Sequence, residues 1–280
     1  MGNNPPKLVD SHAHLEMTDF RKDLEDVIRR ARDSGVDMIF TVGTEKKDWP
    51  RALEIADSHD SIYAILGVHP HNAKEIDDQT YPALAKLCRH KKVKAFGEIG
   101  LDFFRNLSPR EIQVKRFREQ IALARDLGLP MVVHDLDAHR ETLDILKSEK
   151  AEECGGIIHC FSGDYEMAKK CLELGFSISV PGTITFKNAD VFKEIVRRLP
   201  LESLLVETDA PYLTPVPFRG KRNEPSYVRY TAEKVAEVKK VPFEKVAEVT
   251  TQNALRIFRI NDQRCPLGTD TQRVFTDTKH

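Results

Sequence analysis

The sequence has no excess of charge of either sign. Its 43 lysines and arginines balance 44 aspartates and glutamates, which gives a formal net charge of -1. Proteins that attract nucleic acids or membrane surfaces through a global field carry a larger net charge. Any binding of a polyanion must therefore depend on local groups.

Other absences exclude further classes of protein. No hydrophobic run approaches the length of a transmembrane helix, and residues 1–7 lack the apolar stretch of a signal peptide. The five cysteines include no CxxC pair, which argues against a disulfide framework. Neither a GxGxxG fingerprint nor a Walker loop occurs. We expect a cytoplasmic protein with reduced thiols and no membrane partner.

What is present is a regular alternation of two kinds of segment. Short runs rich in Val, Ile, Leu and Phe alternate with longer amphipathic stretches, several of which end at a helix-stopping glycine (Gly35, Gly128 and Gly175). The clearest amphipathic stretches are residues 23–33, 111–127, 164–174 and 191–199. The expected strands are residues 8–10, 38–42, 63–68, 93–99, 130–134, 156–160, 176–180 and 204–207.

Eight such units predict an α/β protein, a (β/α)8 TIM barrel in a single domain. Continuous apolar strands that alternate with helices indicate a parallel sheet with covered faces, and a doubly wound sheet usually has fewer strands. We expect the barrel over residues 8–260, after an N-terminal extension at residues 1–7. The polar residues 261–280 are expected to form a mobile C-terminal tail.

Metal-binding residue types recur at the ends of the expected strands. In His12-Ala13-His14 the two imidazoles are two residues apart, so a strand projects both to one face. The carboxyl ends of barrel strands meet at one rim, where active sites are built. The residues expected to converge there are His12, His14, Glu98, His134, His159 and Asp209.

The chemistry of these six side chains points to divalent cations. Imidazole and carboxylate donors without thiolate suit Mg, Mn or Zn. Six donors exceed the needs of one tetrahedral zinc. The sequence therefore predicts two divalent metal ions that share a bridging carboxylate.

Several blocks of the chain resemble the TatD family of metal-dependent deoxyribonucleases, from Leu8 to about Arg259. The blocks are Ser-His-Ala-His at 11–14, Gly-Val-His-Pro-His at 67–71, Gly-Glu-Ile-Gly-Leu-Asp at 97–102, His-Cys-Phe-Ser-Gly at 159–163, Thr-Phe-Lys-Asn at 185–188, Glu-Thr-Asp-Ala-Pro-Tyr-Leu at 207–213 and Arg-Gly-Lys-Arg-Asn-Glu-Pro at 219–225. One position departs from the family pattern, because Leu136 stands where an arginine is usual. That departure bears on substrate preference or rate.

The resemblance implies an amidohydrolase-superfamily barrel that hydrolyses phosphodiester bonds of DNA. It assigns one metal to His12, His14 and Asp209 and the second to His134 and His159, with Glu98 bridging both. A hydroxide activated by two metals is the expected nucleophile. The catalytic residues are then Glu98 and Asp209, with Asp209 as proton acceptor.

The expected substrate is single-stranded DNA or strand ends, cleaved by a monomeric exonuclease. Two alternatives stay open: a small-molecule amidohydrolase of the same superfamily, and a catalytically weak metal-dependent nucleic-acid binder.

Secondary features each have two interpretations. His69 either contacts a phosphate at the mouth or caps a turn, and Arg219 and Arg222 either bind phosphate or form a solvated surface run with Lys221. Glu207 either points into the barrel wall or orients a neighbour. Cys160 should alternate away from His159 and face the helix layer as a small buried side chain.

Overall fold

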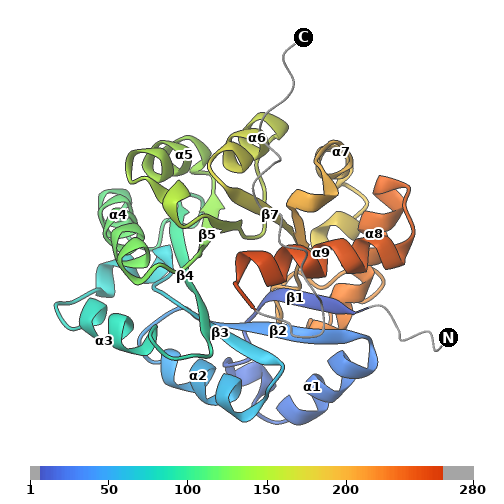
Figure 1. Cartoon of the computed structure of the whole chain (residues 1–280), viewed down its shortest axis with the longest axis horizontal. Helices are drawn as coiled ribbons and strands as arrows, with labels where there is room; N and C mark the ends of the chain where they lie inside the picture. Colours follow the sequence, from blue (N-terminus) through green and yellow to red (C-terminus); the bar gives the residue numbers. More distant parts are fainter. Residues whose placement is uncertain (1–6, 261–280) are drawn as a thin grey trace.

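The strands close into a barrel, as the sequence predicts. The computed structural model describes residues 7–260, in which eight parallel strands pair in chain order from β1 to β8 (Figure 1). An isolated parallel bridge between Ala13 and Ala210 joins the segment after β8 to β1. The strands are β1 (Leu8–Ala13), β2 (Val36–Gly43), β3 (Ile62–Leu66), β4 (Val93–Asp102), β5 (Met131–Leu136), β6 (Gly156–Ile158), β7 (Phe176–Val180) and β8 (Leu204–Val206).

Helices form the outer ring (Figure 1). The ring comprises α1 (Leu24–Asp33), α2 (Trp49–Ser58), α3 (Thr80–Leu87), α4 (Arg110–Leu127), α5 (His139–Ser148), α6 (Tyr165–Glu173), α7 (Asp190–Arg198) and α8 (Val228–Lys239). The helix α9 (Phe243–Ile257) lies across one end of the barrel instead (Figure 1). Short 3-10 turns lie at η1 (Thr18–Phe20), η2 (Pro70–Glu75), η3 (Ala151–Glu153), η4 (Gly182–Thr185), η5 (Leu201–Ser203) and η6 (Pro225–Tyr227).

Local sequence signals explain where several helices begin and end. The Asp164 side chain accepts a hydrogen bond from the amide of Met167 at 2.7 Å, which caps the start of α6. Gly128 adopts a left-handed conformation with φ 64° at the end of α4, where a side chain would be strained. The sequence predicts a helix boundary at each of these two residues.

Two apolar layers hold the barrel together. One lies between the strands and the surrounding helices. The other fills the barrel interior and includes Phe40, whose ring stacks on Phe258 with centroids 4.0 Å apart. Phe258 directly follows α9, which crosses one end of the barrel (Figure 1). The opposite end is left for a site.

The strand predictions hold with changed boundaries. β4 continues to Asp102 and β5 to Leu136, so Glu98 and His134 lie within strands and not at their ends. The predicted tail over residues 261–280, and all but the last residue of the predicted extension over residues 1–7, lie outside the described residues.

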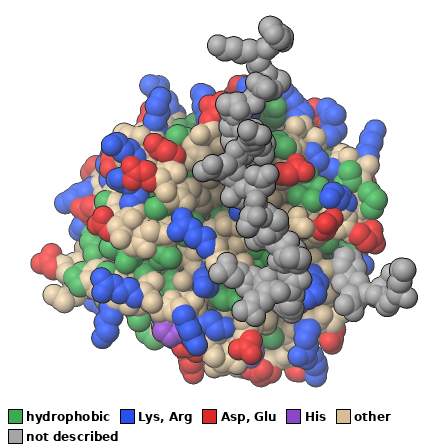
Figure 2. All heavy atoms as spheres, viewed as in Figure 1, with side chains coloured by type: hydrophobic (Ala, Val, Ile, Leu, Met, Phe, Trp, Pro, Cys, Tyr) green, Lys and Arg blue, Asp and Glu red, His purple; other side chains and the backbone are tan. Residues whose placement is uncertain are grey.

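The surface reflects the balanced numbers of positive and negative residues in the sequence. On the face seen in Figure 2, positive and negative side chains are interspersed. No helix in residues 7–260 is long and apolar enough to cross a membrane. Cys88, Cys154, Cys160 and Cys171 are free thiols.

Candidate metal centre

A cavity of ≈ 760 Å³ opens where the loops that follow the strands meet, and we call it the mouth cavity. A cavity of this size is typical of a ligand site. Five of the six predicted metal-binding residues line it, namely His14, Glu98, His134, His159 and Asp209, and the sixth, His12, is fully buried and in contact with them.

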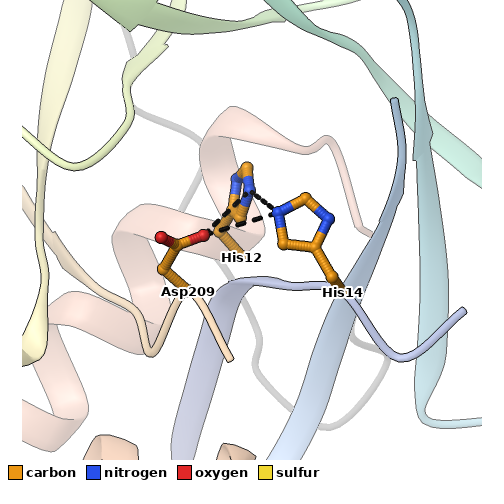
Figure 3. Close-up of side chains that lie close together, drawn as sticks. All are labelled: His12, His14 and Asp209. Carbon is orange, nitrogen blue, oxygen red and sulfur yellow. Dashed lines mark hydrogen bonds and ion pairs between the residues drawn. The ribbon is translucent and has the colours of Figure 1, made fainter. Parts of the chain in front are cut away.

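The first donor group joins the two ends of the barrel sheet. His12 is in β1, His14 follows β1, and Asp209 follows β8; their side chains point toward one another (Figure 3). The Nε2 atoms of His12 and His14 are 3.3 Å apart, and Asp209 Oδ1 lies 3.7 Å and 3.4 Å from them. Asp209 has φ 57°, and its amide donates to the His12 carbonyl at 2.9 Å, which fixes this geometry.

Glu98 lies between this group and a second one. Its Oε2 is 3.3 Å from His12 Nε2. Its Oε1 is 2.7 Å from His134 Nδ1 and 3.7 Å from His159 Nε2. The two oxygens of one carboxylate thus face different sets of imidazoles.

The second group includes a histidine that the sequence assignment left out. His69 Nε2 is 3.4 Å from Glu98 Oε1, and His69, Glu98 and His134 form one cluster of converging donor atoms. His159 instead clusters with His12 and Glu98, and its ring stacks on that of His12. His69 lines the mouth cavity, and its side chain also caps the turn by accepting from the His71 amide. The turn-capping interpretation of His69 is therefore confirmed, and its ring also lies at the mouth.

A second layer of carboxylates orients the imidazoles. Glu16 hydrogen-bonds His14 Nδ1 at 3.2 Å, and Glu207 hydrogen-bonds His159 Nδ1 at 2.9 Å. Such partners fix which ring nitrogen faces a metal. Glu207 therefore orients a neighbour. Glu16 was missed, although it continues the two-residue spacing of His12 and His14.

Asp102 plays the same part on the other side of the cavity. It is buried, lies 2.5 Å from His71 Nε2 and 3.4 Å from His134 Nε2, and accepts from the Arg105 amide at 2.7 Å. His71 ends the Gly-Val-His-Pro-His block and Asp102 ends the Gly-Glu-Ile-Gly-Leu-Asp block. Nothing in the sequence pairs the two residues, because they are 31 residues apart.

Gly100 allows β4 and β5 to approach closely enough for these contacts. Its φ is +145°, and a Cβ there would lie 2.0 Å from the His134 carbonyl oxygen. Only glycine fits this position.

The carboxylates in the centre are ionised. Burial opposes ionisation, but electrostatic interactions with His159 and His69, with hydrogen bonds from His12 and His134, hold the pKa of Glu98 well below its usual range. Burial also acts against Asp209, yet hydrogen bonding to His14 and the nearby imidazoles lower the pKa of Asp209.

The imidazoles respond in opposite directions. Burial lowers the pKa of His69 to about 4, and burial with the neighbouring His159 lowers that of His12. Burial likewise acts against His134, but its hydrogen bonds to Asp102 and Glu98 prevail and raise its pKa to about 10. Asp102 and Glu98 therefore create a strong negative potential around the His134 ring.

These residues fit divalent cations. Buried imidazole nitrogens and carboxylate oxygens converge, and the Nε2 atoms of His12 and His14 face each other. A divalent ion satisfies such a donor set without requiring one imidazole to be charged.

Three other residues lie elsewhere than expected. Arg219 stacks over the Phe186 ring, and Arg222 donates to both Asp23 oxygens at 2.8 and 2.7 Å; neither lines the mouth cavity. The prediction for Cys160 is wrong, because it lines that cavity. β6 ends at Ile158, and a φ of 45° at Cys160 breaks the alternation.

Comparison with known proteins gives a consistent result. Residues 9–259 match the family described as TatD related DNase. The chain is 48% identical over 254 residues to the "uncharacterized metal-dependent hydrolase YabD" of Bacillus subtilis, which covers 91% of this chain and 100% of that protein. It is 35% identical to the "3'-5' ssDNA/RNA exonuclease TatD" of Pantoea ananatis, over 90% of this chain and 99% of the relative. The crystal structure of the TatD homologue YJJV from Escherichia coli superposes with a TM-score of 0.87 at 32% identity, covering 91% of this chain and 99% of that one.

Proposed function

The chain belongs to the TatD-related DNase family of metal-dependent hydrolases, and from this premise we propose that it removes nucleotides from an end of single-stranded nucleic acid using two divalent ions. The exonuclease activity in the name of the Pantoea relative supports a nucleic-acid substrate.

The observation that carries the proposal is the position of Glu98. Its Oε2 faces His12 and its Oε1 faces His134, at 3.3 and 2.7 Å. A carboxylate shared in this way is what two neighbouring ions require. His12, His14 and Asp209 would hold one ion, and His134 with His159 the other, where His69 also lies within reach.

Two divalent ions bound there would neutralise the charge of a phosphodiester and lower the pKa of a water molecule beside it. Asp209 accepts the proton of the attacking water, because it is ionised and its Oδ1 lies within 3.7 Å of three imidazoles of the centre. Glu207 holds His159 in one orientation through its Nδ1.

A strand end fits the shape of the site better than the middle of a duplex. The donor atoms lie at the bottom of the mouth cavity, with His12 fully buried and Glu98 only 3% exposed. A scissile phosphate must enter the cavity to reach them, and a free end enters with less distortion than continuous double-stranded DNA.

The test is hydrolysis of end-labelled single- and double-stranded DNA and of RNA with Mg²⁺, Mn²⁺, Zn²⁺ or EDTA. We expect stepwise shortening of single strands, loss of activity in EDTA and an inactive Glu98→Gln variant. Glu141→Gln, an exposed change on α5, is the matched control. Internal cleavage without stepwise shortening contradicts the exonuclease proposal, and hydrolysis of small amides or esters alone favours the amidohydrolase alternative.

A further inference from the structure

The wall of the mouth cavity is electrically asymmetric. The loop after β2 contributes Glu45 and Asp48, and burial beside Glu45 raises the pKa of Asp48 to about 6. The loop after β4 contributes Arg105, the one arginine or lysine among the cavity-lining residues of the described chain. Arg105 therefore gives the β4 side of the cavity a positive charge that attracts a polyanion.

The Arg105 side chain has no structural partner within residues 7–260. Its side chain is exposed, and within residues 7–260 its guanidinium makes no hydrogen bond or ion pair. Only its backbone amide is engaged, with Asp102, and this contact anchors the start of the loop. The cations of the β2 side are by contrast neutralised, since Lys46 pairs with Asp77 and Lys47 with Glu45.

A second hollow, of ≈ 650 Å³, adjoins the mouth cavity. It shares Leu107 with the mouth cavity and is also lined by Lys74 and Arg110. Lys74 Nζ donates to the Leu107 carbonyl at 3.0 Å, and Arg110 stacks over Phe103, so neither has a carboxylate partner in the described chain. Glu111 is the one carboxylate in this lining.

Apolar side chains are interleaved with these cations. Phe104 is 67% exposed and Leu107 is 54% exposed, in a chain segment that otherwise anchors itself firmly through Asp102 and Ser108. Alternating cations and exposed aromatic rings are typical of surfaces that bind single strands, where phosphates meet the cations and bases stack on the rings.

We propose that Lys74, Phe104, Arg105, Leu107 and Arg110, the loop surface, bind the single-stranded part of the substrate that extends out of the mouth cavity. The inference rests on the proposed function and names the path of the strand. Arg105 holds a phosphate next to the reacting one, Phe104 stacks on a base, and Lys74 and Arg110 hold phosphates further along.

The test measures binding of a phosphorothioate single-stranded oligodeoxythymidine to the metal-loaded protein at several salt concentrations. Arg105→Gln should weaken binding and reduce the slope of log Kd against log salt by about 0.7, the value for one phosphate contact on a single strand. Phe104→Ala should weaken binding about tenfold with an unchanged slope, because it removes stacking and no charge.

Arg140→Gln is the matched control, because Arg140 is 91% exposed on α5 and lines neither hollow. It should bind as wild type, and all variants should retain wild-type metal content. If wild type binds but both loop variants match it, the loop surface is wrong and the proposed function stands. If wild type neither binds nor hydrolyses nucleic acid, both are wrong. Loss of metal in Arg105→Gln also overturns the inference, since the residue would then act through the metal centre.

Discussion

At the scale of single residues, substitution of Glu98 tests whether the two metal sites share a ligand. Glu98→Ala should lower the content of both ions, because each carboxylate oxygen faces a different donor group. His14→Ala should lower the content of one ion, because His14 belongs to one group only. Metal analysis after dialysis measures both. Two full sites in Glu98→Ala would refute the bridging role.

Asp209 is predicted to act in the chemical step. Asp209→Asn keeps the shape and one oxygen of the side chain but removes the ionised acceptor. We expect turnover to fall by about 100-fold or more with little change in KM, the usual size of a lost general base. Steady-state kinetics at saturating metal concentration measures turnover and KM separately. A raised KM with unchanged turnover contradicts a role in proton transfer.

At the scale of elements, the contact between β4 and β5 depends on Gly100. Gly100→Ala puts a methyl group where the His134 carbonyl stands, so one strand must move. We expect a loss of stability of about 2 kcal/mol or more together with a loss of metal. Gly128→Ala is the control, because its φ is also positive but nothing lies within 4 Å. It should cost only about 1 kcal/mol of stability and keep full metal content.

Equal effects of Gly100→Ala and Gly128→Ala on metal content would contradict the role of the close contact between β4 and β5.

The loop after β8 is tied to α1 by ion pairs. Arg222 binds Asp23, and Arg30 binds both Asp23 and Glu224, whose carboxylate is 8% exposed. Arg222 therefore holds the segment that follows Asp209 in place. This pairing explains why Arg222 does not line the mouth cavity.

These pairs predict a pH dependence of stability. Burial opposes ionisation of Glu224, but Arg30 and Ser226 hold its pKa below the usual value near 4.3. A lowered folded pKa stabilises the protein above about pH 4.3, and the contribution is lost as pH falls through the folded pKa. Glu224→Gln should cost about 1–3 kcal/mol at pH 7 and progressively less below pH 4.

Denaturant titrations at several pH values measure this difference. Glu233→Gln is the control, because its exposed pair with Arg229 should contribute under about 1 kcal/mol. A difference between wild type and Glu224→Gln that does not change with pH would show that the carboxylate charge is not responsible.

At the scale of the whole molecule, the centre joins distant parts of the barrel. Its donors come from β1, β4, β5 and the segments after β3, β6 and β8. Ions that bind only the folded state stabilise it by about 2.7 kcal/mol at 100 times Kd, so chelation should lower Tm by about 5–10 °C. Calorimetry with EDTA and with metal restored measures the shift. Glu98→Ala should show little of it, and a wild-type Tm insensitive to EDTA would contradict metal binding at the centre.

Much of the fold and the centre could be predicted because the signals are local. Apolar runs and helix-stopping glycines give eight strands in order, and parallel strands in a barrel bring their carboxyl ends together. His12 and His14 share a face because a strand repeats every two residues. The side chains at the strand ends could therefore be placed together before any contact was known.

Only the tertiary structure decided how side chains distant in sequence pair. Arg222 meets Asp23 across 199 residues, a pairing that no local pattern indicates. His69 reaches Glu98 from the segment after β3, and Cys160 turns into the mouth cavity because its φ of 45° breaks the strand alternation. Among residues 7–260 the Arg105 guanidinium finds no partner. Periodicity determines the face of an element, but the position of a loop side chain depends on partners that no local pattern specifies.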